Sequence, residues 1–141
     1  MATSSSRNSA MSMPFEQVVA SYHRARQTGQ LFDTFYQIFL GKSAEIPPMF
    51  ARTDFPHQKL MLRESLLEML VFAQTGSGHA GMRRLGDRHR QLRVKPVHYE
   101  LWLDALCEAL AAHDSEFSTA LEQMWRAAMS KGIDAMTRVD G

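Results

Sequence analysis

His89 is the polar member of an otherwise apolar helical arc, and histidine is a residue type that can bind a metal ion. At about 100° per residue it falls in one narrow arc with Met82, Leu85 and Leu92. A neutral imidazole can ligate a metal ion. A histidine on an apolar face is more often a core residue that needs only some hydrogen-bond partner. The arc alone leaves both interpretations open.

Gln58 and His57 are adjacent polar residues near the start of a long expected helix. Gln58 heads an apolar stripe that continues through Leu62 and Leu66, whereas His57 belongs to a more polar stripe. We therefore expect Gln58 to lie on the buried face and His57 near its edge. A glutamine in this position is often only a boundary residue, so the pattern by itself does not establish a ligand contact.

The charge pattern around His89 is basic although the chain as a whole is balanced. Six Lys and Arg residues occur between Arg83 and Lys95, against the single acid Asp87. Such a run is ordinarily a solvated helix face. The whole chain has 16 Lys and Arg against 15 Asp and Glu, a net charge of +1. We therefore expect no nucleic-acid partner.

The chain contains one cysteine, Cys107, in 141 residues. This excludes an intramolecular disulfide and a zinc site built from thiolates. No apolar run approaches the roughly 18 residues that a membrane span needs, and the first residues lack a signal-peptide pattern. We expect a soluble cytoplasmic protein without a membrane partner, in which Cys107 acts as a small hydrophobe.

The elements that must position these residues are all expected to be helices. Only 8 Gly and 5 Pro, with many Leu, Met and Ala, favour helix over strand. Apolar periodicity and its interruptions predict helices over residues 14–27, 31–40, 44–50, 54–74, 80–92 and 96–112. A last helix, capped by Asp114 and Ser115, is expected to end near Arg138. Residues 1–13, with five serines and no periodicity, predict a disordered tail before one domain at 14–141.

Several short motifs then occur in a familiar order. They are Thr34-Phe35-Tyr36, the run EIPPMF at 45–50, Gln58-Lys59, His89, Val94, His98-Tyr99, Trp125 and Val139-Asp140. Together they resemble the bacterial single-domain haemoglobins and the globin domain of flavohaemoglobins. The resemblance covers roughly residues 15–140 and implies an all-α globin fold. In that fold, six to seven helices form a haem pocket between the long fourth helix and the basic fifth helix.

The resemblance also implies a role for each matching residue around the cofactor, haem b. His89 corresponds to the proximal histidine that binds the haem iron. Phe50 resembles the phenylalanine that wedges against the porphyrin. The other implied haem contacts are Leu62, Leu85, Arg88, Arg93, Val94, Tyr99 and Leu103. Among them, the arginines, together with Lys95, are candidates to pair with the haem propionates.

On the other side of the haem, Tyr36 and Gln58 resemble the distal pair that hydrogen-bonds a gas ligand. His57 is the competing distal candidate, and the stripe argument favours Gln58. In relatives of the flavohaemoglobin type, a tyrosine and a carboxylate lie near the proximal histidine. Tyr99 matches the tyrosine, and Asp140 aligns with the carboxylate but is shorter and close to the C-terminus.

The leading hypothesis is reversible binding of a diatomic gas, O2, NO or CO, at a haem iron ligated by His89. One alternative is an enzyme, a nitric oxide dioxygenase or a peroxidase-like protein, that depends on an external reductase. A gas-sensing module is a further alternative. The sequence does not distinguish a monomer from a homodimer.

Overall fold

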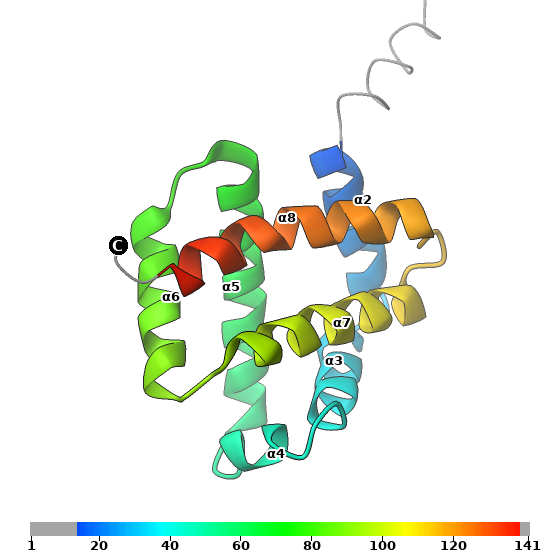
Figure 1. Ribbon diagram of the computed structural model, residues 1–141. Helices are drawn as coiled ribbons and strands as arrows, with labels where there is room; N and C mark the ends of the chain where they lie inside the picture. The colour runs from blue at the N-terminus through cyan, green and yellow to red at the C-terminus, as the bar shows by residue number, and fades with distance from the viewer. Residues whose placement is uncertain (1–13, 139–141) are drawn as a thin grey trace, which may run out of the picture.

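The computed structural model describes residues 14–138, which form seven helices and no strand. The helices are α2 (Pro14–Arg26), α3 (Leu31–Leu40), α4 (Ile46–Met49), α5 (Phe55–Thr75), α6 (His79–Gln91), α7 (Pro96–His113) and α8 (Thr119–Thr137) (Figure 1). The all-α prediction is confirmed. The expected serine-rich tail and the proximal candidate Asp140 lie outside the described residues. Within 14–138, no helix is long and apolar enough to cross a lipid bilayer.

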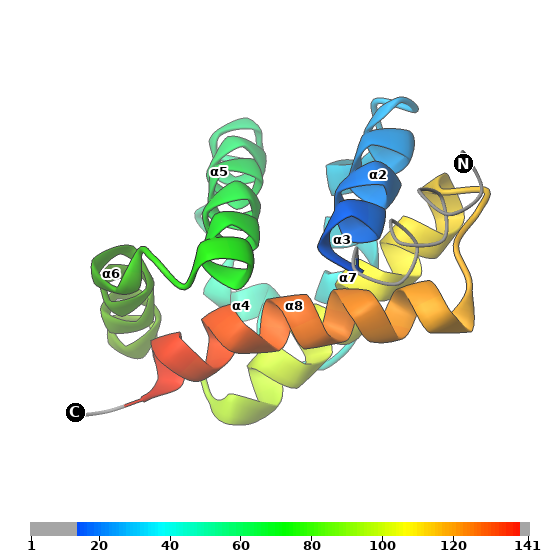
Figure 2. The same ribbon diagram turned by 90° about the horizontal axis from the view of Figure 1, so that it is seen from above.

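Two long helices, α7 and α8, lie side by side and carry the others. Figures 1 and 2 show α2, α3 and α5 crossing over this pair, with α6 beside the C-terminal end of α8. The contacts follow this arrangement, because α3 packs on α7 while α5 and α6 both pack on α8. The chain segment that carries His89 is therefore supported mainly by the last turns of α8.

Local sequence signals explain the ends of α5 and the start of α7. Gly76 ends α5 in the left-handed conformation, at a φ of 73°, that glycine adopts without a Cβ penalty. Pro56 and Pro96 occupy first-turn positions of α5 and α7, where the missing N–H of proline costs no hydrogen bond. These two helices begin and end within two residues of the predicted positions.

The predicted start of the last helix is wrong. The N-cap of α8 is Ser118, whose hydroxyl accepts a hydrogen bond from the Leu121 N–H at 3.1 Å. Asp114 instead lies 2% exposed at the end of α7. Its carboxylate accepts hydrogen bonds from Ser21 at 2.6 Å and from Nε of Arg24 at 2.6 Å. Ser21 and Arg24, some ninety residues away, thus bind the side chain that the spacing predicted to be a helix cap.

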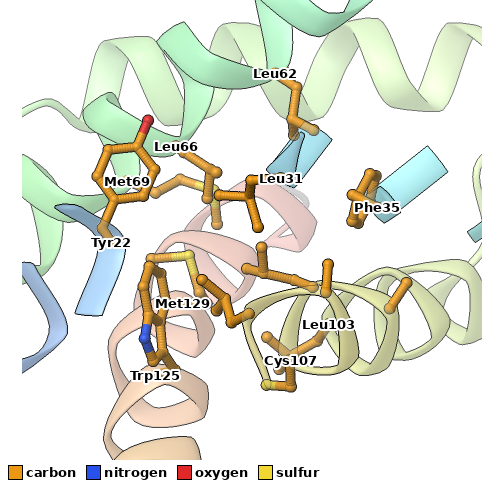
Figure 3. Packing of buried hydrophobic residues seen from close by; sticks show 14 of the residues in the cluster. Tyr22, Leu31, Phe35, Leu62, Leu66, Met69, Leu103, Cys107, Trp125 and Met129 are labelled. Carbon is orange, nitrogen blue, oxygen red and sulfur yellow. The ribbon is translucent and has the colours of Figure 1, made fainter. Parts of the chain in front are cut away.

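The core lies between the α7–α8 layer and the helices that cross it. Trp125 is completely buried at its centre and donates a hydrogen bond from Nε1 to Ser21 at 3.0 Å. Figure 3 shows it near Tyr22 and Met129, with Leu62 and Leu103 on other helices of the same cluster. Cys107 is 3% exposed within this cluster and is not in a disulfide. The cysteine thus packs as the small hydrophobe that was expected.

Candidate functional site

A cavity of about 290 Å³ lies beside His89. Its lining is mainly apolar and comes from α3, the α4 corner, α5, α6, α7 and α8. Nine of the expected site residues line it: Tyr36, Phe50, Gln58, Leu62, Leu85, Arg88, His89, Val94 and Tyr99. Residues far apart in the sequence are thus brought to one enclosed apolar space, the usual form of a cofactor site.

Three expected site residues lie elsewhere. The side chain of His57 is exposed on α5, one residue from Gln58 but on a different face. Leu103 is 8% exposed on α7 and packs in the general core rather than in the cavity wall. Arg93 is exposed in the turn after α6 and has a φ of 63°. The structure gives none of these three a contact with the cavity.

His89 enters the cavity from the last turn of α6. Its Nδ1 is the only buried side-chain nitrogen or oxygen atom of residues 14–138 that has no hydrogen-bond partner. The ring instead meets Tyr99 edge to face, with centroids 5.7 Å apart. A structural core histidine normally has its ring nitrogens satisfied. This unpartnered ring therefore favours the ligand interpretation of His89 over the core interpretation.

The protonation state of His89 also suits a metal ligand. Burial first, and the nearby Arg88 guanidinium second, lower the pKa of the imidazole below its usual 6.5. The ring is therefore neutral at pH 7, which is the form that coordinates metals. Across residues 14–138 no group of three or more His, Cys, Asp or Glu side chains could hold a metal ion. One imidazole in an apolar cavity fits a metal whose other ligands come from an organic ring.

Tyr36 and Gln58 form a polar pair within the same apolar cavity. Nε2 of Gln58 donates a hydrogen bond to the Tyr36 hydroxyl oxygen at 3.1 Å. Burial raises the pKa of Tyr36 to about 12, against the opposing effect of the Gln58 hydrogen bond. Phe50 and Phe55 contact the Tyr36 ring edge to face, at 5.8 and 5.4 Å between centroids. The tyrosine is thus a fixed, protonated hydroxyl whose own hydrogen remains available to a ligand.

Sequence reasoning missed His98 as a lining residue. His98 is 3% exposed, and its Nδ1 accepts a hydrogen bond from the Lys95 backbone N–H at 2.9 Å. Its Nε2 therefore carries the hydrogen and donates to Glu45 at 2.9 Å. This contact joins the start of α7 to the residue before α4. The two partners are 53 residues apart, so no local spacing could have indicated it.

A second hollow of about 440 Å³ lies against α7 and α8, on the side of Cys107. It is more open to solvent than the first. Its charged lining is already paired, because Arg126 binds both Asp104 and Glu122 at 2.9 Å. None of the expected site residues lines this hollow. The cavity at His89 is therefore the candidate functional site.

The fold and the site together define a class of protein: a helical bundle in which one histidine enters an apolar cavity that also holds a hydrogen-bonding pair. Comparison with known proteins agrees with this description of the fold and the site. A family model described as Globin matches residues 69–136, which include His89. No curated protein matches the sequence.

A solved structure extends the match to nearly the whole chain. It is protein PA3967 from Pseudomonas aeruginosa PAO1, described as structurally highly homologous to a human haemoglobin. The two chains are 36% identical, with a TM-score of 0.84, and the match covers 88% of this chain and 95% of that one. The chain belongs to the globin family.

Proposed function

We propose that the protein binds haem b through His89 and reversibly binds a diatomic gas at the haem iron. The observation that carries the proposal is the unpartnered, neutral imidazole of His89 in an apolar cavity that also contains the Tyr36–Gln58 pair. When bound, haem would supply an iron with one coordination position left for O2, NO or CO. The fold and the family membership support this proposal.

Each lining residue has a role that follows from its chemistry and place. Phe50 and Leu62 offer flat and branched apolar surfaces to a planar cofactor. Arg88 is exposed on α6 and also lines the cavity, which supports a role for its guanidinium in pairing with a cofactor carboxylate. Leu85 and Val94 enclose the space beside His89. Arg93, Leu103 and His57 have no part in the site that we propose.

The Tyr36–Gln58 pair would determine how firmly a polar gas ligand is held. Gln58 donates to the Tyr36 oxygen, and this orients the hydroxyl. The Tyr36 hydrogen is then free to stabilise negative charge on a ligand in the cavity. Such a contact favours dioxygen over less polar gases.

Absorption spectra of the purified protein test the proposal. We expect a Soret band after haem addition, with distinct ferric, ferrous and carbonyl forms. His89→Ala should weaken haem binding and change the ferrous spectrum. His57→Ala is the matched control, because this histidine is exposed and outside the cavity. Absence of a Soret band in the wild-type protein, or unchanged haem binding in His89→Ala, contradicts the proposal.

A second candidate function is oxidation of NO to nitrate by bound dioxygen, with an external reductase to return the iron to the ferrous state. The contact of Tyr99 with His89, together with the polar pair, favours it. Stopped-flow mixing of the oxygenated protein with NO tests this candidate. Slow decay of the oxygenated form argues for gas carriage instead. For either function we propose a cytoplasmic location, on the ground of the single unpaired cysteine.

A further inference from the structure

The α6 helix, which carries His89, is held against the last turn of α8 by two features that flank the histidine. In Figure 1 the C-terminal end of α8 lies across α6, and α6 packs on α8 much more than on α5. The first feature, Gly86, is buried in this contact three residues before His89. The second, Arg90, follows His89 directly.

At Gly86 the two helices approach too closely for any side chain. A Cβ built on Gly86 would lie 2.2 Å from the carbonyl oxygen of Met136, 2.9 Å from its carbonyl carbon and 3.0 Å from its Cα. All three atoms are backbone and have no rotamer into which they could move. Carbon–oxygen contacts are normally no shorter than about 3.3 Å, so an alanine would force the helices apart by about 1 Å.

The same Met136 carbonyl receives a hydrogen bond from Arg90. Nη1 of Arg90 donates to it at 2.9 Å. Met136 lies in the last turn of α8, where carbonyl groups have no partner within the helix, so the guanidinium satisfies an otherwise free acceptor. The Met136 side chain is 4% exposed and lines the cavity beside His89. One residue of α8 thus contacts α6 on both sides of the histidine and also borders the site.

We infer that Gly86 is a positioning residue: by letting α6 lie directly on the last turn of α8, it sets how far the His89 imidazole reaches into the cavity. Arg90 keeps α6 in this position through its hydrogen bond to the Met136 carbonyl. The inference rests on the proposed function, since the position of His89 matters only if the imidazole ligates a cofactor. Helix propensity alone predicts that Gly86→Ala strengthens α6, because alanine is the better helix former. The inference predicts the opposite result.

Resonance Raman spectra of the ferrous haem-loaded protein test the inference through the iron–imidazole stretching band. We expect Gly86→Ala to shift this band and to lose haem at least about tenfold faster, which corresponds to the lower end of the cost of overpacking. Gly81→Ala is the matched control on the same helix. A Cβ there meets only side-chain atoms, at 3.6 Å and beyond, so its band and haem-loss rate should equal those of the wild type.

A second pair of variants keeps the test decisive if Gly86→Ala fails to fold. Arg90→Gln removes the bond to Met136 without a clash, and we expect a smaller shift of the same band. Asp87→Asn is its control, because it removes the ion pair of Arg90 with Asp87 and leaves the Met136 contact in place. An unshifted band in folded Gly86→Ala overturns the inference, and if Gly86→Ala does not fold, an unshifted band in Arg90→Gln overturns it. Failure of the wild-type protein to bind haem overturns the proposed function instead, so the two failures are distinguishable.

Discussion

Removal of the Tyr36 hydroxyl should weaken retention of dioxygen and leave the pocket otherwise intact. Tyr36 is 6% exposed, and its ring is held by edge-to-face contacts with Phe50 and Phe55. Tyr36→Phe keeps these contacts and deletes one oxygen atom. The change in packing energy should therefore be small. The weaker retention of dioxygen should then reflect the loss of the hydrogen bond that the hydroxyl offers to a ligand.

The expected magnitude follows from the value of one hydrogen bond. Between residues 14 and 138 the hydroxyl oxygen has one hydrogen-bond partner, Nε2 of Gln58 at 3.1 Å, so its own hydrogen is uncommitted. A bond from a neutral donor to a partly charged ligand contributes about 1 to 2 kcal/mol, which corresponds to dioxygen dissociation about 5 to 30 times faster in Tyr36→Phe. Gln58→Leu should have a smaller effect, because Gln58 acts partly by orienting the hydroxyl. The double variant should be less than additive.

Stopped-flow displacement of dioxygen by carbon monoxide measures the dissociation rate. Tyr22→Phe is the matched control, since Tyr22 is 4% exposed and lies outside the cavity. Carbon monoxide dissociation should change little in Tyr36→Phe, because that ligand carries less negative charge. The pKa of Tyr36, raised to about 12 by burial, keeps the hydroxyl protonated at neutral and mildly alkaline pH. The wild-type dioxygen dissociation rate should therefore not vary over that pH range. An unchanged dioxygen dissociation rate in Tyr36→Phe would refute the role of the hydroxyl.

Three further predictions concern the scaffold. Asp114→Asn should lower the free energy of unfolding in urea by about 2 to 4 kcal/mol at pH 7, because it removes the nearer and buried of the two carboxylates that pair with Arg24. Burial raises the pKa of Asp114, but the hydrogen bonds led by that of Arg24 outweigh it and lower the pKa below its usual 3.8. The difference from wild type should therefore persist above 3.8 and shrink as the pH falls below 3.8 through the lowered pKa. Ser118→Ala should cost about 1 kcal/mol through loss of the α8 cap, whereas Ser115→Ala should leave the unfolding midpoint unchanged. The Cys107 thiol, whose pKa burial raises to about 12, should resist alkylation at pH 8 in the folded protein and react only in urea, as followed by mass spectrometry.

Much of the scaffold was predictable because its signals are local. The apolar period and the prolines and glycines placed α5 and α7 within two residues of their observed ends. The same periodicity separated Gln58, which lines the cavity, from the exposed His57. It also placed His89 on an apolar face together with Leu85 and Leu92, both of which line the cavity. These helix faces were predictable because they depend only on the direction in which a side chain points from its own helix.

The features that were missed depend on partners supplied by other helices. Asp114 looked like a helix cap, yet Arg24 and Ser21 of α2 bind it. Gly86 carries no chemical signal at all, and its role exists only because the carbonyl of Met136 lies where its side chain would be. His89 illustrates the boundary between the two kinds of inference. Its helix face could be predicted from spacing, but an unpartnered ring nitrogen depends on all surrounding helices, and it is this property that favours a cofactor ligand over a core histidine.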